Sequence, residues 1–161
     1  MSDIIIRKAK KEDSGHIAEV MLDFYNMENA QEAKNAFISE LSKDYKYILA
    51  MEDGSIVGLV TWLMHGLPKH GLFELDRICI LSKSRGKGVG RILVNALIDD
   101  AKNWYEDHGS KIRKLYLLTH EDNTLAQAFY EKVGFHYEAT LDSHYYENKD
   151  ERLYSIFFND Q

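Results

Sequence analysis

The feature that most constrains this chain is the glycine-rich stretch Arg-Gly-Lys-Gly-Val-Gly at residues 85–90. An apolar run at residues 78–80 precedes it, and an amphipathic helical pattern begins at Val89. A strand followed by such a loop and a helix N-terminus presents backbone N–H groups and the positive end of the helix dipole to an anion. Glycines let the backbone approach a phosphate closely, because no Cβ stands in the way. We therefore expect this loop to hold a pyrophosphate.

Side-chain charge and glycine spacing limit which class of phosphate-binding loop this stretch can be. Arg85, Lys87 and Arg91 add positive charge, and an arginine can donate to two phosphate oxygens at once. The glycines lie at positions 86, 88 and 90, so the spacing fits neither G-x-x-x-x-G-K-[ST] nor G-x-G-x-x-G. The alternative is a basic surface turn between a strand and a helix. A second segment of the chain helps to decide between a phosphate-binding loop and such a turn.

That second segment, residues 123–135, reads as a short helix ended by Gly134 and followed by a strand. Asn123, Ala126 and Tyr130 share one helical stripe by their i, i+3, i+7 spacing. Together the two segments resemble the GNAT superfamily of acyl-CoA N-acyltransferases. The family pattern [RQ]-x-x-G-x-[GA] is met by Arg85, Gly88 and Gly90, and the pattern N-x-x-A-x-x-F-Y-x-x-x-G-F is met by Asn123, Ala126, Phe129, Tyr130, Gly134 and Phe135.

The resemblance implies an α/β fold with a mixed, mostly antiparallel sheet, about four flanking helices, and separated fourth and fifth strands. It also implies acetyl-CoA as co-substrate. The pantetheine arm would pair with the backbone of the fourth strand, the pyrophosphate would lie on the loop, and the helix that begins at Asn123 would flank the arm. The residues implied for this binding are Ile78, Cys79, Ile80, Arg85, Gly86, Lys87, Gly88, Val89, Gly90, Asn123, Ala126 and Tyr130.

Two carboxylates on the predicted fourth strand are candidate bases. Glu74 and Asp76 are two residues apart and therefore share one face of the strand. Acidic side chains on a strand that leads into a cofactor loop can take a proton from an amine, directly or through water. Glu74 is slightly favoured for its longer arm and higher reference pKa. The alternative is that one or both carboxylates pair with Arg77 or another basic side chain, or face solvent.

For Tyr130 the resemblance implies a proton donor to the departing CoA thiolate. A phenol ordinarily titrates near pH 10, so it holds a proton at neutral pH and can release it to a developing thiolate. The alternative is an aromatic core residue beside Phe129. Asn123 is expected to bind the pantetheine, to cap its own helix, or both.

Composition excludes several classes of protein. A chain of 161 residues that is 45% hydrophobic can bury one good core, so residues 1–161 are predicted to form a single domain. No apolar run approaches 18 residues, which argues against a membrane span. A net charge of −6 argues against nucleic acid as a partner. The single Cys79 suits a cytoplasmic location and is expected as a buried small hydrophobe, and no metal is expected from the adjacent His120, Glu121 and Asp122.

The hydrophobic pattern predicts an α/β order of elements. Asp53-Gly54 is a hairpin turn, and Asp13 or Ser14 caps the first helix. The expected helices lie at residues 14–25, 30–41, 89–105 and 123–133, and the expected strands at 4–9, 47–51, 56–64, 72–80, 112–119, 135–145 and 153–158.

These observations predict an N-acetyltransferase that moves an acetyl group from acetyl-CoA to a primary amine by direct transfer in a ternary complex. The acceptor is a small amine such as a polyamine, an amino acid derivative, or a protein N-terminus or lysine. The segment at residues 143–147 resembles the closing hairpin of ribosomal-protein alanine N-acetyltransferases, so Tyr145 or Tyr146 is expected to contact the acceptor. A homodimer is a possible state. The alternative function is a non-catalytic acyl-CoA-binding sensor or interaction module.

Overall fold

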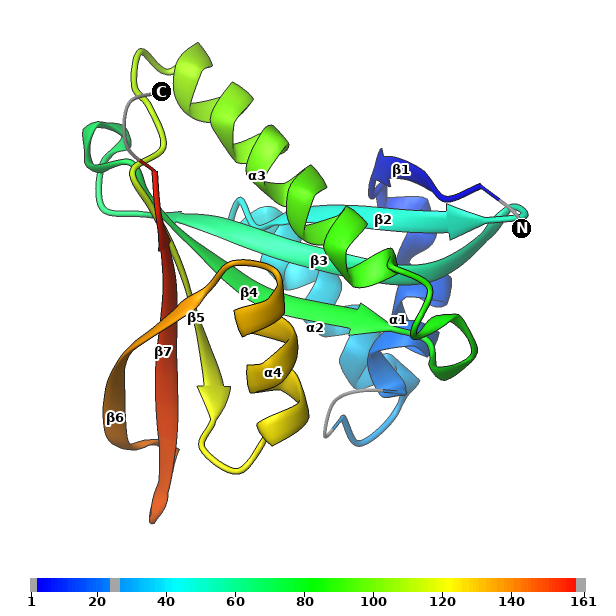
Figure 1. The fold of residues 1–161 in the computed structure, drawn as a ribbon. Coiled ribbons are helices and arrows are strands. Elements are labelled where there is room, and N and C mark those ends of the chain that lie inside the picture. Colours follow the sequence, from blue (N-terminus) through cyan, green and yellow to red (C-terminus); the bar gives the residue numbers. More distant parts are fainter. Residues whose placement is uncertain (1–2, 24–26, 159–161) are drawn as a thin grey trace. The chain divides into compact units, whose positions relative to one another are not determined.

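The computed structural model describes residues 3–23 and 27–158 and has a mixed α/β fold, as predicted (Figure 1). The described residues form four α-helices and one seven-stranded sheet with the strand order β1-β2-β3-β4-β5-β7-β6. Strands β4 and β5 pair in parallel, whereas β1–β2, β2–β3, β5–β7 and β6–β7 pair antiparallel. The elements are β1 (Ile5–Lys8), α1 (Ser14–Leu22), α2 (Ala30–Ser42), β2 (Lys46–Glu52), β3 (Ser55–His65), β4 (Leu72–Ile80), α3 (Val89–Asp107), β5 (Lys114–His120), α4 (Thr124–Lys132), β6 (His136–Tyr146) and β7 (Lys149–Phe157).

Two compact units divide the chain. The first unit comprises Met1–Leu63 and Arg77–Asp100, and the second comprises Met64–Asp76 and Ala101–Gln161. Strands β3 and β4 and helix α3 each run from one unit into the other. Across the described ranges, no helix is both long and apolar enough to cross a membrane.

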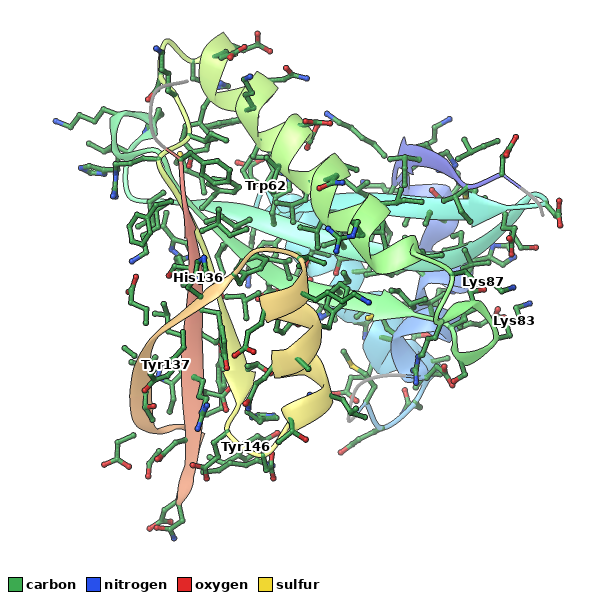
Figure 2. All side chains as sticks on the ribbon, in the orientation of Figure 1. Trp62, Lys83, Lys87, His136, Tyr137 and Tyr146 are labelled. Carbon is green, nitrogen blue, oxygen red and sulfur yellow. The ribbon has the colours of Figure 1, made fainter. Side chains whose placement is uncertain are left out.

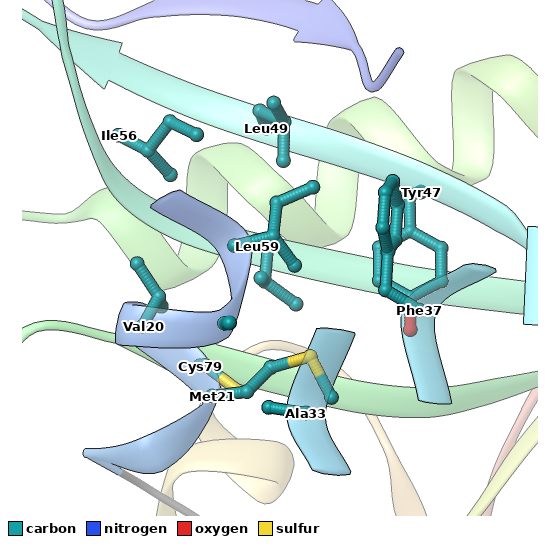
Figure 3. Packing of buried hydrophobic residues seen from close by; sticks show 11 residues of the cluster. Val20, Met21, Ala33, Phe37, Tyr47, Leu49, Ile56, Leu59 and Cys79 are labelled. Carbon is teal, nitrogen blue, oxygen red and sulfur yellow. The ribbon is translucent and has the colours of Figure 1, made fainter. Parts of the chain in front are cut away.

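The core of the first unit is built by α1, α2 and the strands they cover (Figure 3). Phe37 of α2 meets Tyr47 of β2 edge to face, with ring centroids 4.9 Å apart. Cys79 is fully buried in the same cluster, which confirms the prediction of a small hydrophobe. The buried residues of α1 are Ile17, Ala18, Val20 and Met21. The predicted continuation of this helix to Phe24 and Tyr25 lies outside the described residues.

Asp13 occupies the N-cap position of α1, but its carboxylate does not cap the helix. It accepts hydrogen bonds from Arg7 Nη1 at 2.9 Å and Arg7 Nη2 at 2.8 Å, and from the Lys10 backbone N–H at 2.8 Å. The hydrogen bonds from Arg7, more than that from Lys10, lower the pKa of Asp13 to about 2. The predicted capping role is therefore replaced by a charged fork that ties β1 to the turn before α1.

Replacing Asp13 by asparagine is expected to destabilise the fold at pH 7 and to have little effect at pH 2. Because the folded-state pKa is depressed, the carboxylate stabilises the fold above the unfolded-state pKa near 4, and this stabilisation is lost as the pH falls through about 2. Arg7 is 36% exposed, so solvent screening limits the effect to about 1 kcal/mol. Urea unfolding of both proteins at several pH values measures it, and a pH-independent difference would contradict this assignment.

The second unit contains a three-stranded antiparallel part in which β7 pairs with both β5 and β6, and β6 and β7 lie side by side (Figure 1). Strand β7 begins at Lys149, four residues before the predicted start at Leu153. The extra residues are polar and show no apolar pattern, yet Glu151 and Arg152 are in register with β5. Backbone pairing therefore extends the strand further than side-chain hydrophobicity indicates.

The hairpin between β2 and β3 is as predicted. Asp53 and Gly54 have φ values of 51° and 80°, which is the pair of positive values that a type I′ turn needs. Strand β3 ends at His65, one residue beyond the predicted end at residue 64. That one-residue difference places His65 on a strand, where its side chain has a fixed direction.

Candidate active site

The loop that joins β4 to α3 has the geometry expected of an anion-binding loop. A 3₁₀ turn at Ser82–Ser84 is followed by Gly86 and Gly88 with φ values of 76° and 82°, and α3 begins at Val89. The first helical hydrogen bond runs from the Ile92 N–H to the Gly88 carbonyl, at 3.2 Å. The backbone N–H groups ahead of it lie in the first turn, where an α-helix supplies no partner.

The space around this loop fits a phosphate group. A Cβ added at Gly86 or at Gly88 would meet no atom within 4 Å, so the open side of the backbone is accessible. The hydroxyl of Ser84 is buried and has no hydrogen-bond partner in the described part of the chain. The accessible glycine backbone leaves room for an anion beside residues 86–88.

The basic side chains of the loop differ in their roles. Arg85 donates from Nε to the Ile80 carbonyl at 3.1 Å, so this arginine also braces the end of β4. Lys83 and Lys87 are exposed on the turn between β4 and α3 (Figure 2). The loop therefore offers exposed positive charge beside its backbone N–H groups.

The second unit brings Glu74 to the place where β4 and β5 stop pairing. The parallel ladder covers Leu72↔Lys114, Phe73↔Leu115 and Glu74↔Tyr116, and no further pair between these strands is formed in the described residues. Both strands continue beyond it, β4 to Ile80 and β5 to His120. The ladder therefore ends at Glu74 while both strands run on.

Glu74 is nearly buried, with its side chain 12% exposed, and it is held by two neighbours. His65 Nε2 lies 2.7 Å from Glu74 Oε1, and the Tyr116 hydroxyl donates to the same oxygen at 3.3 Å. The rings of His65 and Tyr116 are 5.4 Å apart. The hydrophobic pattern, which predicts a strand at residues 56–64, did not indicate this contact, because the contact depends on the sheet rather than on neighbouring residues.

Arg77 is not the partner of Glu74. Its guanidinium forks onto Glu40 of α2, with Nη1–Oε1 at 2.8 Å and Nη2–Oε2 at 3.1 Å, and also donates to the Tyr47 hydroxyl at 2.9 Å. The basic side chain that pairs with Glu74 is His65. Asp76 is half-buried on the same strand, and its charge adds to that of Glu74 in acting on Tyr116.

Helix α4 carries the second motif. Asn123 caps it, accepting a hydrogen bond from the Ala126 N–H at 3.1 Å, which confirms the capping half of its prediction. Tyr130 is 9% exposed and its ring lies against Phe129 and Phe135, with centroids 5.5 Å and 5.8 Å away. These contacts fix the ring.

Gln127 is a structural residue that the sequence did not reveal. Its buried amide donates to the carbonyls of His120 and Glu121, both at 3.0 Å, and so fastens α4 to the end of β5. His120 in turn pairs with the buried carboxylate of Glu151 on β7. Within residues 3–23 and 27–158, no cluster of three or more histidine, cysteine, aspartate or glutamate side chains could hold a metal ion.

The exposed tyrosines of the closing hairpin lie on β6. Tyr146, which Figure 2 labels, approaches His120, with ring centroids 6.0 Å apart. Tyr145 contributes to raising the pKa of Tyr116.

Comparison with known proteins identifies the family. The model of the acetyltransferase (GNAT) family matches residues 15–135, so the chain belongs to this family. The chain is 31% identical over 105 residues to spermine/spermidine N(1)-acetyltransferase of Bacillus subtilis, covering 61% of this chain and 64% of that protein. It is 26% identical over 146 residues to the L-amino acid N-acetyltransferase AaaT of Escherichia coli, covering 87% of each.

Solved structures show the same fold. The ribosomal-protein-S18-alanine N-acetyltransferase of Escherichia coli aligns with a TM-score of 0.79 at 17% identity, covering 99% of this chain and 96% of that one. YncA from Salmonella typhimurium, solved with acetyl-CoA, aligns with a TM-score of 0.71 at 16% identity, covering 98% and 95%. The seven-stranded mixed sheet and four helices are thus the GNAT fold.

Proposed function

We propose that this protein is an acetyl-CoA-dependent N-acetyltransferase that acetylates a primary amine by direct transfer. The observation that carries the proposal is the accessible glycine backbone of residues 86–88 ahead of α3, in a chain that belongs to the GNAT family. Acetyl-CoA would supply a thioester carbonyl to an attacking amine. The amide C–N bond forms, the C–S bond breaks, and the thiolate leaves.

Residues of the loop and of β4 would hold the co-substrate. Backbone N–H groups of residues 86–90, with Arg85 and Lys87, would bind the pyrophosphate. The backbone of Ile78, Cys79 and Ile80 would pair with the pantetheine amides as an added strand does. Asn123 and Ala126 of α4 would contact the arm, and the Tyr130 hydroxyl would give its proton to the leaving sulfur.

The amine must lose a proton before it attacks. An aliphatic amine with a pKa near 10.4 is neutral in only about one molecule in 2,500 at pH 7, a cost of about 4.6 kcal/mol. Glu74, held at the end of the β4–β5 ladder, would accept this proton directly or through water, and Asp76 is the second candidate.

The acceptor class that suits this cluster is a cationic aliphatic amine. Glu74 and Asp76 on β4 supply negative charge, which attracts an ammonium group. The Bacillus subtilis relative that carries a spermine/spermidine acetyltransferase name supports polyamines as the first candidates. Amino acids, named for the AaaT relative, and protein N-termini come next. We also propose that the protein acts in the cytoplasm and forms one domain. A homodimer is a further state of this proposal.

Isothermal calorimetry at neutral pH with acetyl-CoA, CoA, ATP and NAD tests the binding half of the proposal. Selective binding of acetyl-CoA and CoA is expected, followed by thiol release with members of an amine and peptide panel. Binding without turnover on any acceptor would favour a non-catalytic acyl-CoA sensor. Absence of acetyl-CoA binding would overturn both the acetyltransferase proposal and the acyl-CoA sensor alternative.

Replacing Lys87 by glutamine is expected to weaken acetyl-CoA binding by about 3- to 10-fold, the value of one exposed charge-assisted contact to phosphate. Lys83→Gln removes an equal charge from the 3₁₀ turn of the same loop and is the matched control, with an expected change below about 2-fold. Calorimetry at two salt concentrations measures both, because a phosphate contact also makes binding salt-dependent. Equal effects of the two variants would show that Lys87 contributes general positive charge rather than a specific contact to phosphate.

A further inference from the structure

The two hydrogen-bond partners of Glu74 use the same oxygen. His65 Nε2 and the Tyr116 hydroxyl both reach Oε1, at 2.7 Å and 3.3 Å. Among the described residues no partner reaches Oε2, and this oxygen is not among the buried atoms that lack a partner. The carboxylate is therefore anchored on one side and accessible on the other.

Both neighbours are placed by the sheet rather than by flexible loops. His65 is the last residue of β3, and Tyr116 is the register partner of Glu74 on β5. The two rings contact each other at 5.4 Å, which restricts both side chains. Neighbours fixed in this way hold a carboxylate in one orientation, which catalysis by proton transfer requires.

Tyr116 is a hydrogen-bond donor at neutral pH. Burial raises its pKa above the usual range, and the charges and hydrogen bond of Glu74, with smaller contributions from Tyr145 and Asp76, raise it further. A phenol that stays protonated donates to Oε1 and cannot compete with Glu74 for the proton of the substrate.

We propose that His65 and Tyr116 are positioning residues that fix Glu74 through Oε1 so that Oε2 receives the proton of the acceptor amine. The inference rests on the proposed acetyl transfer and assigns the base within it. The proton moves from the ammonium nitrogen to Oε2, directly or through one water, and the freed lone pair of the amine forms the new C–N bond. His65 and Tyr116 keep their own protons throughout.

Four variants test this arrangement: His65→Phe, His65→Gln, Tyr116→Phe and the double variant His65→Phe/Tyr116→Phe. Glutamine retains an N–H donor near the place of Nε2, whereas phenylalanine keeps a ring without a donor. We expect His65→Phe to lower kcat by about 10- to 100-fold with unchanged acetyl-CoA affinity, and His65→Gln to recover to within about 3-fold of the unmodified protein. A merely structural role would not separate kcat from binding in this way.

The double variant tests whether the two residues act through one oxygen. Because both donate to Oε1, their effects should be non-additive, and neither variant should reduce activity further in a Glu74→Gln background. Additive losses, or equal losses in His65→Gln and His65→Phe, would overturn the positioning role. Calorimetry with acetyl-CoA and circular dichroism on each variant serve as folding controls.

The outcomes separate this inference from the proposed function. Turnover in the unmodified protein together with full activity in His65→Phe would overturn the positioning role alone. Selective acetyl-CoA binding with no turnover of any amine in the unmodified protein would overturn the acetyltransferase function, and the assignment of a base would fall with it.

Discussion

Replacing Tyr130 by phenylalanine is expected to lower kcat by about 100-fold or more while the affinity for CoA changes by less than about 3-fold. The ring of Tyr130 packs against Phe129 and Phe135, and phenylalanine keeps these contacts. What the variant removes is the hydroxyl, the group proposed to protonate the leaving thiolate, and positioned acid catalysis contributes about 10²- to 10⁴-fold to rates. Thiol-release kinetics and calorimetry measure the two quantities on the same preparation.

Tyr137→Phe is the matched control for this prediction. Tyr137, labelled in Figure 2, also lies in the second unit. Its hydroxyl hydrogen-bonds the exposed Thr140 on the same strand, so the same chemical change should leave kcat unaltered. A loss of CoA affinity as large as the loss of kcat in Tyr130→Phe would show that the hydroxyl binds the co-substrate rather than acting as an acid. Full activity of Tyr130→Phe would show that another donor, such as water, protonates the leaving thiolate.

Replacing Glu74 by glutamine is expected to lower kcat/KM for the amine by about 100-fold at pH 7. The amide still accepts at Oε1 from His65 and Tyr116, so the local structure is kept, but it cannot take a proton. The deficit should shrink as the pH rises toward the pKa of the amine near 10.4, because the neutral form then becomes available without a base. A pH–rate profile of both proteins from pH 7 to 10 measures this convergence.

Asp76→Asn provides the comparison that decides between the two carboxylates. It lies two residues further along β4 and carries the same charge, so it controls for the general loss of negative potential. We expect its profile to follow that of the unmodified protein within about 3-fold. A large loss in Asp76→Asn with little change in Glu74→Gln would move the base to Asp76 and would contradict the positioning role of His65.

Local sequence determined the features that depend on neighbouring residues. The loop at residues 85–90 needs glycines where φ is positive, and Gly86 and Gly88 adopt such values. The type I′ turn at Asp53-Gly54 also depends on residues that accept positive φ. The cap at Asn123 depends on a hydrogen bond to a residue three positions later. The hydrophobic pattern also predicted the helices at residues 14–25 and 30–41, which form as α1 and α2. These are interactions within a few residues, so one sequence is enough to predict them.

Tertiary structure decided which side chains meet. Glu74 is nine residues from His65 and 42 from Tyr116, and its partners follow from where β3 ends and from the register of β5. Likewise, Arg77 reaches Glu40, which lies 37 residues away on α2. A strand register is set by the sum of many backbone and packing contacts, and a shift of one residue turns every side chain to the other face. The sequence therefore determined the binding loop and the candidate base, whereas only the folded sheet determined which neighbours hold that base and which of its oxygens they leave accessible.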